Sequence, residues 1–253
     1  MKALVSVAGH LLPSQLRPHH LTQITDDWKR LTPQTRYGYH QNLRKILREL
    51  QFSGAPPGLD LHVAKMPQPS PRAVTATQAE RAALIAAAKP GLRLMILLCS
   101  DLALRHRTAR NLAPCHYDRE RRAIATNTKA GRVIMLPVTE QIAALLATCQ
   151  HEGPQSSTPF VTMLGGPSCR DAINKQFRQL RQRLNIDRRI TFHDLRRTTA
   201  YRTYEITKDL RLVQALLGHA NLNTTLHYLD HHITTVPREL LEQVSANPKG
   251  FDA

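Results

Sequence analysis

The sequence predicts a mainly α-helical fold with a small antiparallel β-sheet, on three observations. Apolar residues recur at spacings of three and four in several segments, as on one face of a helix. The segments Arg122–Thr126 and Val133–Val138 have strand-like compositions and flank the turn NTKAGR, which predicts a hairpin. The segment Met66–Pro71 holds three prolines in six residues. Because proline interrupts helices and stiffens an extended chain, this segment predicts a linker between two domains.

Before the linker, the segment Thr32–Leu50 predicts one amphipathic helix. Its apolar face, at helical spacing, is formed by Leu43, Ile46, Leu47 and Leu50. Three basic residues fall between these positions and face solvent or DNA phosphates: Arg44, Lys45 and Arg48. An ordinary solvated helix surface explains these three residues almost equally well. Gly38 weakens the predicted helix locally.

After the linker, the sequence predicts a series of helices. Thr77–Glu80 (TQAE) has a capping-box pattern at the start of an alanine-rich helix that stops at Pro90-Gly91. Leu92–Leu104 is strongly apolar and predicts a core helix. A further amphipathic helix, flanked by arginines, has as its apolar face Ile173, Phe177, Leu180 and Leu184. From there the chain is helical again beyond residue 193, with predicted breaks near Lys208 and at Gly218.

The chain is strongly basic. Its net charge is +16 and its pI is about 10.4. Basic residues extend from Arg17 to Lys249, so the charge does not belong to one tail. A field of this sign attracts polyanions, and nucleic acid is the first candidate. A basic solvated surface without a polyanionic partner is the alternative interpretation.

Several other classes of protein are disfavoured by the sequence. The four cysteines are widely spaced and form no CxxC pair, which argues against a disulfide framework or a cysteine zinc site. The sequence shows no glycine-rich nucleotide loop and no metal motif, which disfavours a small-molecule enzyme, and we expect neither a metal ion nor a cofactor. The N-terminal MKALVSVAGHLL resembles a signal peptide only faintly, since His10 interrupts it, and no run is long enough to span a membrane. We expect a soluble, cytoplasmic, nucleoid-associated protein without a membrane partner.

Two motifs near the C-terminus carry a set of chemically competent residues. They are HDLRRTTA, from His193 to Ala200, and LLGHANLNTTLHY, from Leu216 to Tyr228. This pattern resembles the signature of the tyrosine recombinases, the phage integrase family. Upstream, ALRHRTARNLAPCHYD resembles the first conserved box of the family and NTKAGR its β-hairpin. The resemblance assigns six catalytic positions, in chain order: Arg105, Lys129, His193, Arg196, His219 and Tyr228.

The resemblance implies a reaction in which DNA is cut and rejoined. Tyr228 would attack the scissile phosphate and form a 3′-phosphotyrosine bond, while Lys129 would protonate the leaving 5′ oxygen. Arginine suits the phosphate because its planar, permanently charged fork can donate two hydrogen bonds to it. The phosphotyrosine bond keeps the energy of the phosphodiester, so that a second 5′-hydroxyl can reseal it without metal or ATP. The implied architecture is a catalytic domain over residues 75–253 with a C-terminal tail, preceded by a shortened helical core-binding domain (1–65) and a linker (66–74).

Two departures from the family pattern keep other functions open. The family usually has glycine two residues before the first arginine, where this chain has Ala103, and an acid three residues after it, where this chain has Thr108. A catalytically weakened member that binds DNA as an accessory protein is therefore one alternative. A type IB topoisomerase, which uses a similar residue set, is the other.

Double-stranded DNA is the expected partner. The predicted DNA contacts are Arg44, Lys45, Arg48, Arg107, Arg110 and Arg197. In the family, four protomers act on two DNA sites and the segment after the tyrosine packs on a neighbour. We therefore expect a homotetramer on DNA, possible accessory DNA-bending proteins, and a short tail helix around Pro237–Val244.

Overall fold

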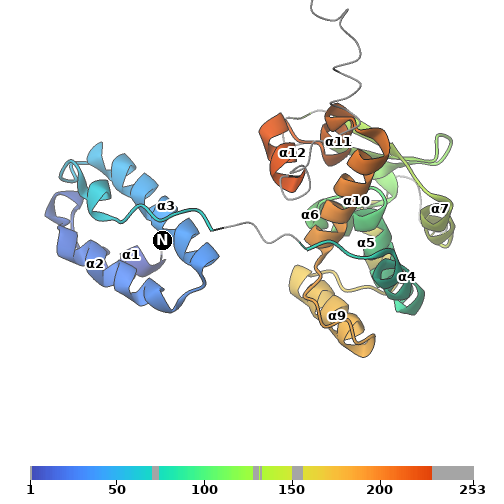
Figure 1. Cartoon of the computed structure of the whole chain (residues 1–253), viewed down its shortest axis with the longest axis horizontal. Helices are drawn as coiled ribbons and strands as arrows, with labels where there is room; N and C mark the ends of the chain where they lie inside the picture. The colour runs from blue at the N-terminus through green and yellow to red at the C-terminus, as the bar shows by residue number, and fades with distance from the viewer. Residues whose placement is uncertain (1, 70–73, 128–130, 132, 150–155, 230–253) are drawn as a thin grey trace, which may run out of the picture. The chain divides into compact units, whose positions relative to one another are not determined.

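The computed structural model describes residues 2–69, 74–127, 131, 133–149 and 156–229. The chain forms two compact units that divide between Arg72 and Ala73, inside the segment predicted as the linker. Figure 1 shows the first unit in blue and the second in green to red. The predicted class, mainly α-helical with a small antiparallel sheet, is confirmed. In the described part of the chain, no helix combines the length and the apolar character needed to cross a membrane.

The first unit is built from α1 (Lys2–Ala8), α2 (Pro18–Asp26) and α3 (Pro33–Gln51), joined by short 3-10 turns. The predicted helix Thr32–Leu50 is confirmed as α3, whose N-cap Thr32 accepts a hydrogen bond from the backbone N–H of Thr35 at 3.4 Å. Two of its four predicted apolar residues, Leu43 and Leu47, are buried. They pack in a core of their own with Leu21, Ile24, Trp28 and Leu59.

Gly38, in the interior of α3, gives a direct stability prediction. A Cβ added there would meet no atom within 4 Å. Because glycine in a helix interior costs about 0.5–1 kcal/mol relative to alanine, Gly38→Ala should stabilise the first unit by about that amount. The only tryptophan of the chain, Trp28, lies in this core and reports its unfolding by fluorescence. An unchanged or lower denaturation midpoint would contradict the prediction.

The second unit contains nine further α-helices, one 3-10 helix (Pro114–His116) and one sheet among its described residues. The helices are α4 (Gln78–Ala87), α5 (Pro90–Ser100), α6 (His106–Arg110), α7 (Glu140–Ala147), α8 (Phe160–Met163), α9 (Arg170–Arg183), α10 (Phe192–Thr207), α11 (Leu210–Leu217) and α12 (Leu222–Leu229). The strands are β1 (Tyr117–Asp118), β2 (Ala123–Asn127) and β3 (Val133–Pro137). The predicted capping box is confirmed, since Thr77 and Glu80 exchange side-chain-to-backbone hydrogen bonds at the start of α4.

Helix α5 is the centre of this unit, in contact with α4, α6, α7, α8, α9 and α10. Its middle is fully buried, from Leu94 to Cys99. The predicted core helix Leu92–Leu104 was too long at its C-terminal end, because α5 stops at Ser100. The chain cannot continue as a helix there, since Ala103 has a left-handed φ of 49°. This turn after α5 leads directly to Arg105.

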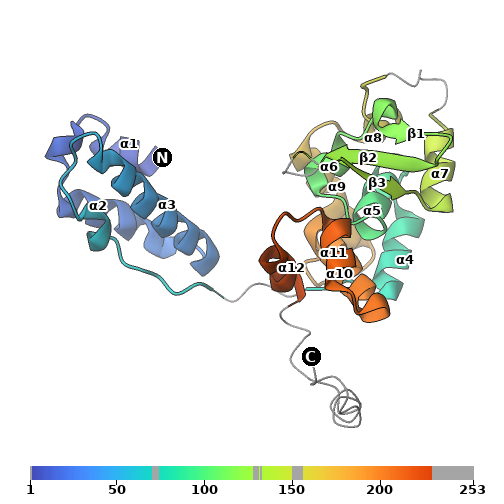
Figure 2. The same ribbon diagram turned by 90° about the horizontal axis from the view of Figure 1, so that it is seen from above.

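The sheet has the antiparallel order β1-β2-β3. The predicted hairpin is confirmed as β2 and β3, in a register that pairs Ile124 with Leu136. Both of these side chains are buried in the main core. Figure 2 shows the strands and α7 on one side of α5, and α10, α11 and α12 on the other. Lys129, at the predicted hairpin turn, lies outside the described residues.

The helices that carry the C-terminal motifs are interrupted where the sequence predicts. Thr191 caps α10, and the Asp194 carboxylate accepts hydrogen bonds from the Thr191 backbone N–H at 2.8 Å and hydroxyl at 2.7 Å. The breaks at Lys208 and Gly218 are confirmed, with left-handed φ values of 51° and 59°. Helix α10 is fixed to α5 by the Thr199 hydroxyl, which donates to a carbonyl of α5 at 2.6 Å. The predicted tail helix around Pro237–Val244 lies outside the described residues.

Candidate active site

Arg196 is the best-buried charged residue of the C-terminal motifs. It lies on α10 and is 3% exposed. Its Nη1 donates to the carbonyl of Ala103, and its Nη2 donates to the carbonyl of Leu217 at 2.6 Å. One guanidinium therefore joins α10 to the turn after α5 and to the end of α11. Two carbonyl acceptors fix its orientation, as a phosphate-binding fork requires.

The conformation of Ala103 explains how the chain dispenses with the glycine usual in the family. With φ at 49°, the residue adopts the left-handed region, and its carbonyl accepts the hydrogen bond from Arg196. The left-handed conformation costs an L-residue about 1–2 kcal/mol. The methyl group is fully buried against Ala200, Val213 and Leu217, which offsets part of that cost. The alanine thus keeps the backbone geometry that holds Arg196.

His219 is held as a neutral imidazole with a defined tautomer. Arginine can only donate hydrogen bonds, so His219 Nε2, at 3.5 Å from Arg196 Nη2, is the acceptor of that long contact. The ring proton then lies on Nδ1, which donates to the Thr225 hydroxyl at 3.0 Å. Burial, followed by the positive charges of Arg196, Arg105 and His193, lowers the pKa of His219 from 6.5 to about 4. The imidazole is therefore uncharged at neutral pH.

Arg105 and His193 belong to the same cluster. Arg105 is the N-cap residue of α6, and His193 lies in the first turn of α10 with its side chain exposed. Partial desolvation lowers the pKa of His193, and so do Arg197, Arg196 and Arg105, against the opposing effect of Asp194. The structure therefore brings four of the six predicted catalytic residues together: Arg105, His193, Arg196 and His219.

The predicted nucleophile, Tyr228, belongs to α12, which is tied to this cluster through Thr225. Thr225 is fully buried and precedes Tyr228 by three residues, about one turn of the helix. The sequence interpretation assigned no role to Thr225. The only signal for it was the Thr-Thr pair between the histidine and the tyrosine, and one of these two threonines is exposed. Lys129, the predicted general acid, lies outside the described residues.

The predicted DNA contacts differ in how exposed their side chains are. Lys45, Arg48 and Arg107 are exposed, and Arg110 is half-buried. Two others, Arg44 and Arg197, are largely buried, and their contact with DNA stays a prediction. Arg44, 15% exposed, lies 3.9 Å from the Asp60 carboxylate, and Arg197 is 8% exposed. Helical periodicity placed Arg44 on a polar face without revealing what covers it.

Thr225→Val tests whether this hydroxyl orients the cluster. The change keeps the branched shape but leaves the buried Nδ1–H of His219 without its acceptor, which costs about 1–3 kcal/mol. Because displacement of catalytic groups by about 1 Å can cost about 100-fold in rate, we expect a cleavage defect of up to that size. Thermal unfolding and single-turnover cleavage of a DNA substrate are the measurements. Thr224→Val, at the exposed neighbouring position of α12, is the matched control and should change neither.

Chemically, the cluster combines two guanidinium groups with two histidines whose pKa values are both lowered, first by burial and then by nearby positive charge. A site of this kind favours a ligand that brings negative charge, and a forked guanidinium matches the oxygens of a phosphate. A phosphodiester in which negative charge accumulates on the equatorial oxygens during attack is stabilised by such preorganised donors.

Comparison with known proteins identifies the family of this chain. Residues 74–234 match the phage integrase family. A tyrosine recombinase XerC 2 of Ralstonia nicotianae is 31% identical over 185 residues, which cover 68% of this chain and 53% of the relative. A tyrosine recombinase XerC of Rhodospirillum centenum is 36% identical over 110 residues, covering 43% of this chain and 32% of the relative. The chain belongs to the phage integrase family of tyrosine recombinases.

Solved structures agree at the level of the fold. The Tn1549 transposon integrase in complex with transposon right end DNA superposes with a TM-score of 0.69 at 14% identity, covering 93% of this chain and 86% of that one. The XerH site-specific recombinase bound to difH substrate gives a TM-score of 0.68 at 19% identity, covering 93% and 71%. The aligned part of this chain spans about a third to a half of the two curated relatives described above.

Proposed function

We propose that the protein is a site-specific DNA strand transferase that cuts and rejoins double-stranded DNA through Tyr228. The observation that carries the proposal is the position of Arg196, whose guanidinium contacts His219, while His219 in turn bonds to the helix that contains Tyr228. The Arg196 guanidinium, proposed to bind the phosphate, and the helix that carries the nucleophile are thereby connected through two contacts.

In the proposed reaction, Arg105 and Arg196 hold the non-bridging oxygens of the scissile phosphate. The Tyr228 phenol attacks phosphorus, the phosphodiester bond to the 5′ oxygen breaks, and Lys129 supplies the proton to that oxygen. His193, exposed beside the phosphate site, accepts the phenol proton or donates a hydrogen bond to an oxygen. The neutral imidazole of His219 holds Arg196 and α12 in position relative to each other. Attack by a 5′-hydroxyl on the phosphotyrosine reverses these steps and reseals the strand.

The proposed assembly follows from the proposed chemistry. Two strands exchange partners only if several active sites meet, so we propose a homotetramer on two DNA sites. Accessory DNA-bending proteins are proposed as further partners. The assembly would act on nucleoid DNA in the cytoplasm. The helical domain (1–65) and the catalytic domain (75–253) are proposed to clamp the duplex, joined by the linker (66–74). Phosphate contacts then dominate affinity, and binding weakens steeply with salt.

The test uses tagged wild-type protein and Tyr228→Phe, each expressed in cells that carry the native DNA of the protein. After denaturing purification, covalently attached DNA is sequenced. Attached fragments that converge on one short site with the wild type, and none with Tyr228→Phe, support the proposal. Attached DNA from the Phe variant would refute the assignment of the nucleophile.

A second assay separates the recombinase from the topoisomerase and accessory alternatives. The site found in cells is placed on two distinguishable DNA molecules and incubated with the protein. Joints between the two molecules support strand transfer. Relaxation of supercoils without exchange indicates the topoisomerase, and specific binding without cleavage of a nicked suicide substrate indicates an accessory protein.

A further inference from the structure

The segment that follows the predicted linker, residues 76–80, is bonded to helix α10. The backbone N–H of Ala76 donates to the Thr198 hydroxyl at 2.8 Å. One turn further along α10, the Arg202 guanidinium donates to the side-chain carbonyl of Gln78 at 2.7 Å. This post-linker segment therefore holds α10 at two successive turns.

A third contact joins the post-linker segment to the chain just before α10. The Arg188 Nε donates to the Glu80 carboxylate at 3.2 Å, and Nη2 donates to the second oxygen of the same carboxylate. Arg188 lies three residues before Thr191, the N-cap of α10. Two parallel bonds from one guanidinium fix its direction as well as its distance. The segment thus contacts both α10 and the residues that lead into it.

The Thr198 hydroxyl connects Ala76 to the first turn of α10. A hydroxyl has one proton to donate and two lone pairs that accept. While it accepts from Ala76, Thr198 donates to the backbone carbonyl of Asp194 at 2.8 Å. Both Ala76 and Thr198 are buried, at 4% and 6% exposure. Since Asp194 directly follows His193, two hydrogen bonds join the post-linker segment to the turn that carries His193.

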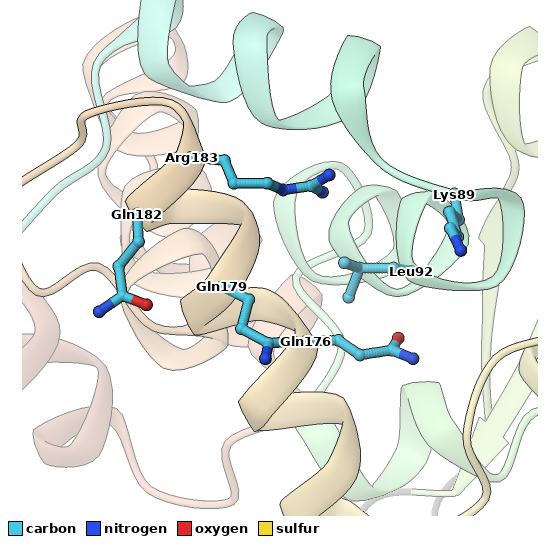
Figure 3. Close-up of a pocket in the computed structure, with 6 residues that line it drawn as sticks. All are labelled: Lys89, Leu92, Gln176, Gln179, Gln182 and Arg183. Carbon is cyan, nitrogen blue, oxygen red and sulfur yellow. The ribbon is translucent and has the colours of Figure 1, made fainter.

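The chain beyond the other end of α4 is arranged differently. There, Lys89 and Leu92 face α9 across a hollow of about 650 Å³, whose other lining residues are Gln176, Gln179, Gln182 and Arg183. Figure 3 shows these side chains on the two facing elements. Close packing against α9 therefore does not reach this end, and it does not explain the position of the post-linker segment. The hydrogen bonds of that segment to α10 and to Arg188 account for its position instead.

We infer that Thr198 is a positioning residue, through which the end of the linker fixes the first turn of α10 and the direction of the His193 side chain. The inference rests on the proposed function, in which His193 acts beside the scissile phosphate. Separation of Ala76 from Thr198 would leave a buried N–H without an acceptor, which is unfavourable. A shift of the linker's end is therefore passed to the helix that carries His193 and Arg196.

The first experiment compares Thr198→Val with Thr198→Ser in the full-length protein. Valine keeps the branched shape but cannot accept from Ala76, whereas serine keeps the hydroxyl. Single-turnover cleavage of a nicked suicide duplex carrying the site found in cells gives the rate at saturating DNA, and anisotropy in the Tyr228→Phe background gives the affinity. We expect Thr198→Val to cleave about 10-fold to 100-fold more slowly. Its Kd should stay within about twofold, because no charge that binds phosphate changes. Thr198→Ser should cleave within about threefold of the parent.

A second variant removes the same hydrogen bond from its other end. Ala76→Pro deletes the backbone N–H and leaves α10 unchanged. Because two substitutions that remove one interaction do not add in their effects, the double variant should cleave no more slowly than the slower single variant. Thr203→Val, at a half-buried position further along α10, is the matched control and should change neither rate nor affinity. Circular dichroism melting identifies the variants that are folded at the assay temperature, and Ala76→Pro gives the same readouts if Thr198→Val does not fold.

The NMR signals of the His193 imidazole report the position of this ring without any chemistry. They are assigned with His193→Gln, and the signals of His40, which lies in the first unit, serve as the reference. Thr198→Val should shift the His193 signals and leave those of His40 in place. Thr198→Ser should shift neither set.

A Thr198→Val variant that melts at a lower temperature, yet cleaves at the parent rate with unchanged His193 signals, would make the bond merely structural and overturn the inference. Additive effects in the double variant, or equal losses with valine and serine, would also overturn it. Shifted His193 signals without attachment to DNA by the wild type would keep the positioning role and reject the strand transferase. Attachment by the wild type, with unchanged signals and an unchanged rate in Thr198→Val, would do the reverse.

Discussion

Arg196→Met is expected to reduce DNA cleavage by at least about 10³-fold while leaving the fold in place. Removal of a single preorganised donor from a charge-stabilising site costs about 10²–10³-fold, and here both the fork and its charge are lost. The stability change should be smaller, because two effects oppose each other. The carbonyls of Ala103 and Leu217 lose their donor, at about 1–3 kcal/mol each, while the cost of burying a charge at 3% exposure disappears.

Single-turnover cleavage of a nicked suicide substrate and denaturant unfolding measure the two effects in one protein. Arg196→Lys serves as the partner variant, since it keeps the charge but replaces the planar fork by a point charge. We expect the lysine variant to cleave faster than the methionine variant and far more slowly than the wild type. Cleavage by Arg196→Met within about tenfold of the wild type would show that this guanidinium does not hold the phosphate.

Acidification is expected to destabilise the second unit by about 2 kcal/mol between pH 7 and pH 5 through His219 alone. The pKa of His219 is about 4 in the folded chain, against 6.5 for the ordinary imidazole. As pH falls, the unfolded chain therefore takes up the proton first. The stabilising contribution of the neutral ring is complete above about pH 6.5 and is lost as pH falls toward 4.

Urea denaturation, followed by circular dichroism at pH 7 and pH 5, measures this loss in the free energy of unfolding. His219→Gln removes the titrating group, so its stability should decrease by about 2 kcal/mol less over the same interval. Fluorescence of Trp28 monitors the first unit in the same samples, since this tryptophan lies in that unit's core. A loss of equal size in wild type and His219→Gln would mean that His219 is not held neutral by its surroundings.

Local sequence rules predicted the elements that position the candidate site. The capping box at Thr77, the strand pair β2–β3 and the breaks at Lys208 and Gly218 follow from short-range chemistry, and each is found in the structure. The predicted core helix failed at its C-terminal end. The backbone turns at Ala103, whose carbonyl accepts a hydrogen bond from Arg196, and helical periodicity gives no information about such a long-range bond.

The roles of polar residues were harder to predict than the elements. Arg44 and Lys45 are adjacent in sequence, yet Arg44 is largely covered and lies near Asp60, while Lys45 is exposed. Similarly, Thr225 is buried and bonds to His219, while its threonine neighbour is exposed. Such distinctions depend on which distant segments of the chain pack together, and short-range patterns in a single sequence do not show this.

Mass spectrometry of a trapped adduct determines whether Tyr228 becomes covalently joined to DNA. Wild-type protein is incubated with a nicked suicide duplex carrying the site found in cells, then digested with protease and nuclease. We expect a nucleotide on the peptide that contains Tyr228, linked through its 3′ phosphate. A nucleotide on Tyr201 or Tyr204, or a 5′ linkage on any residue, would refute Tyr228 as the nucleophile.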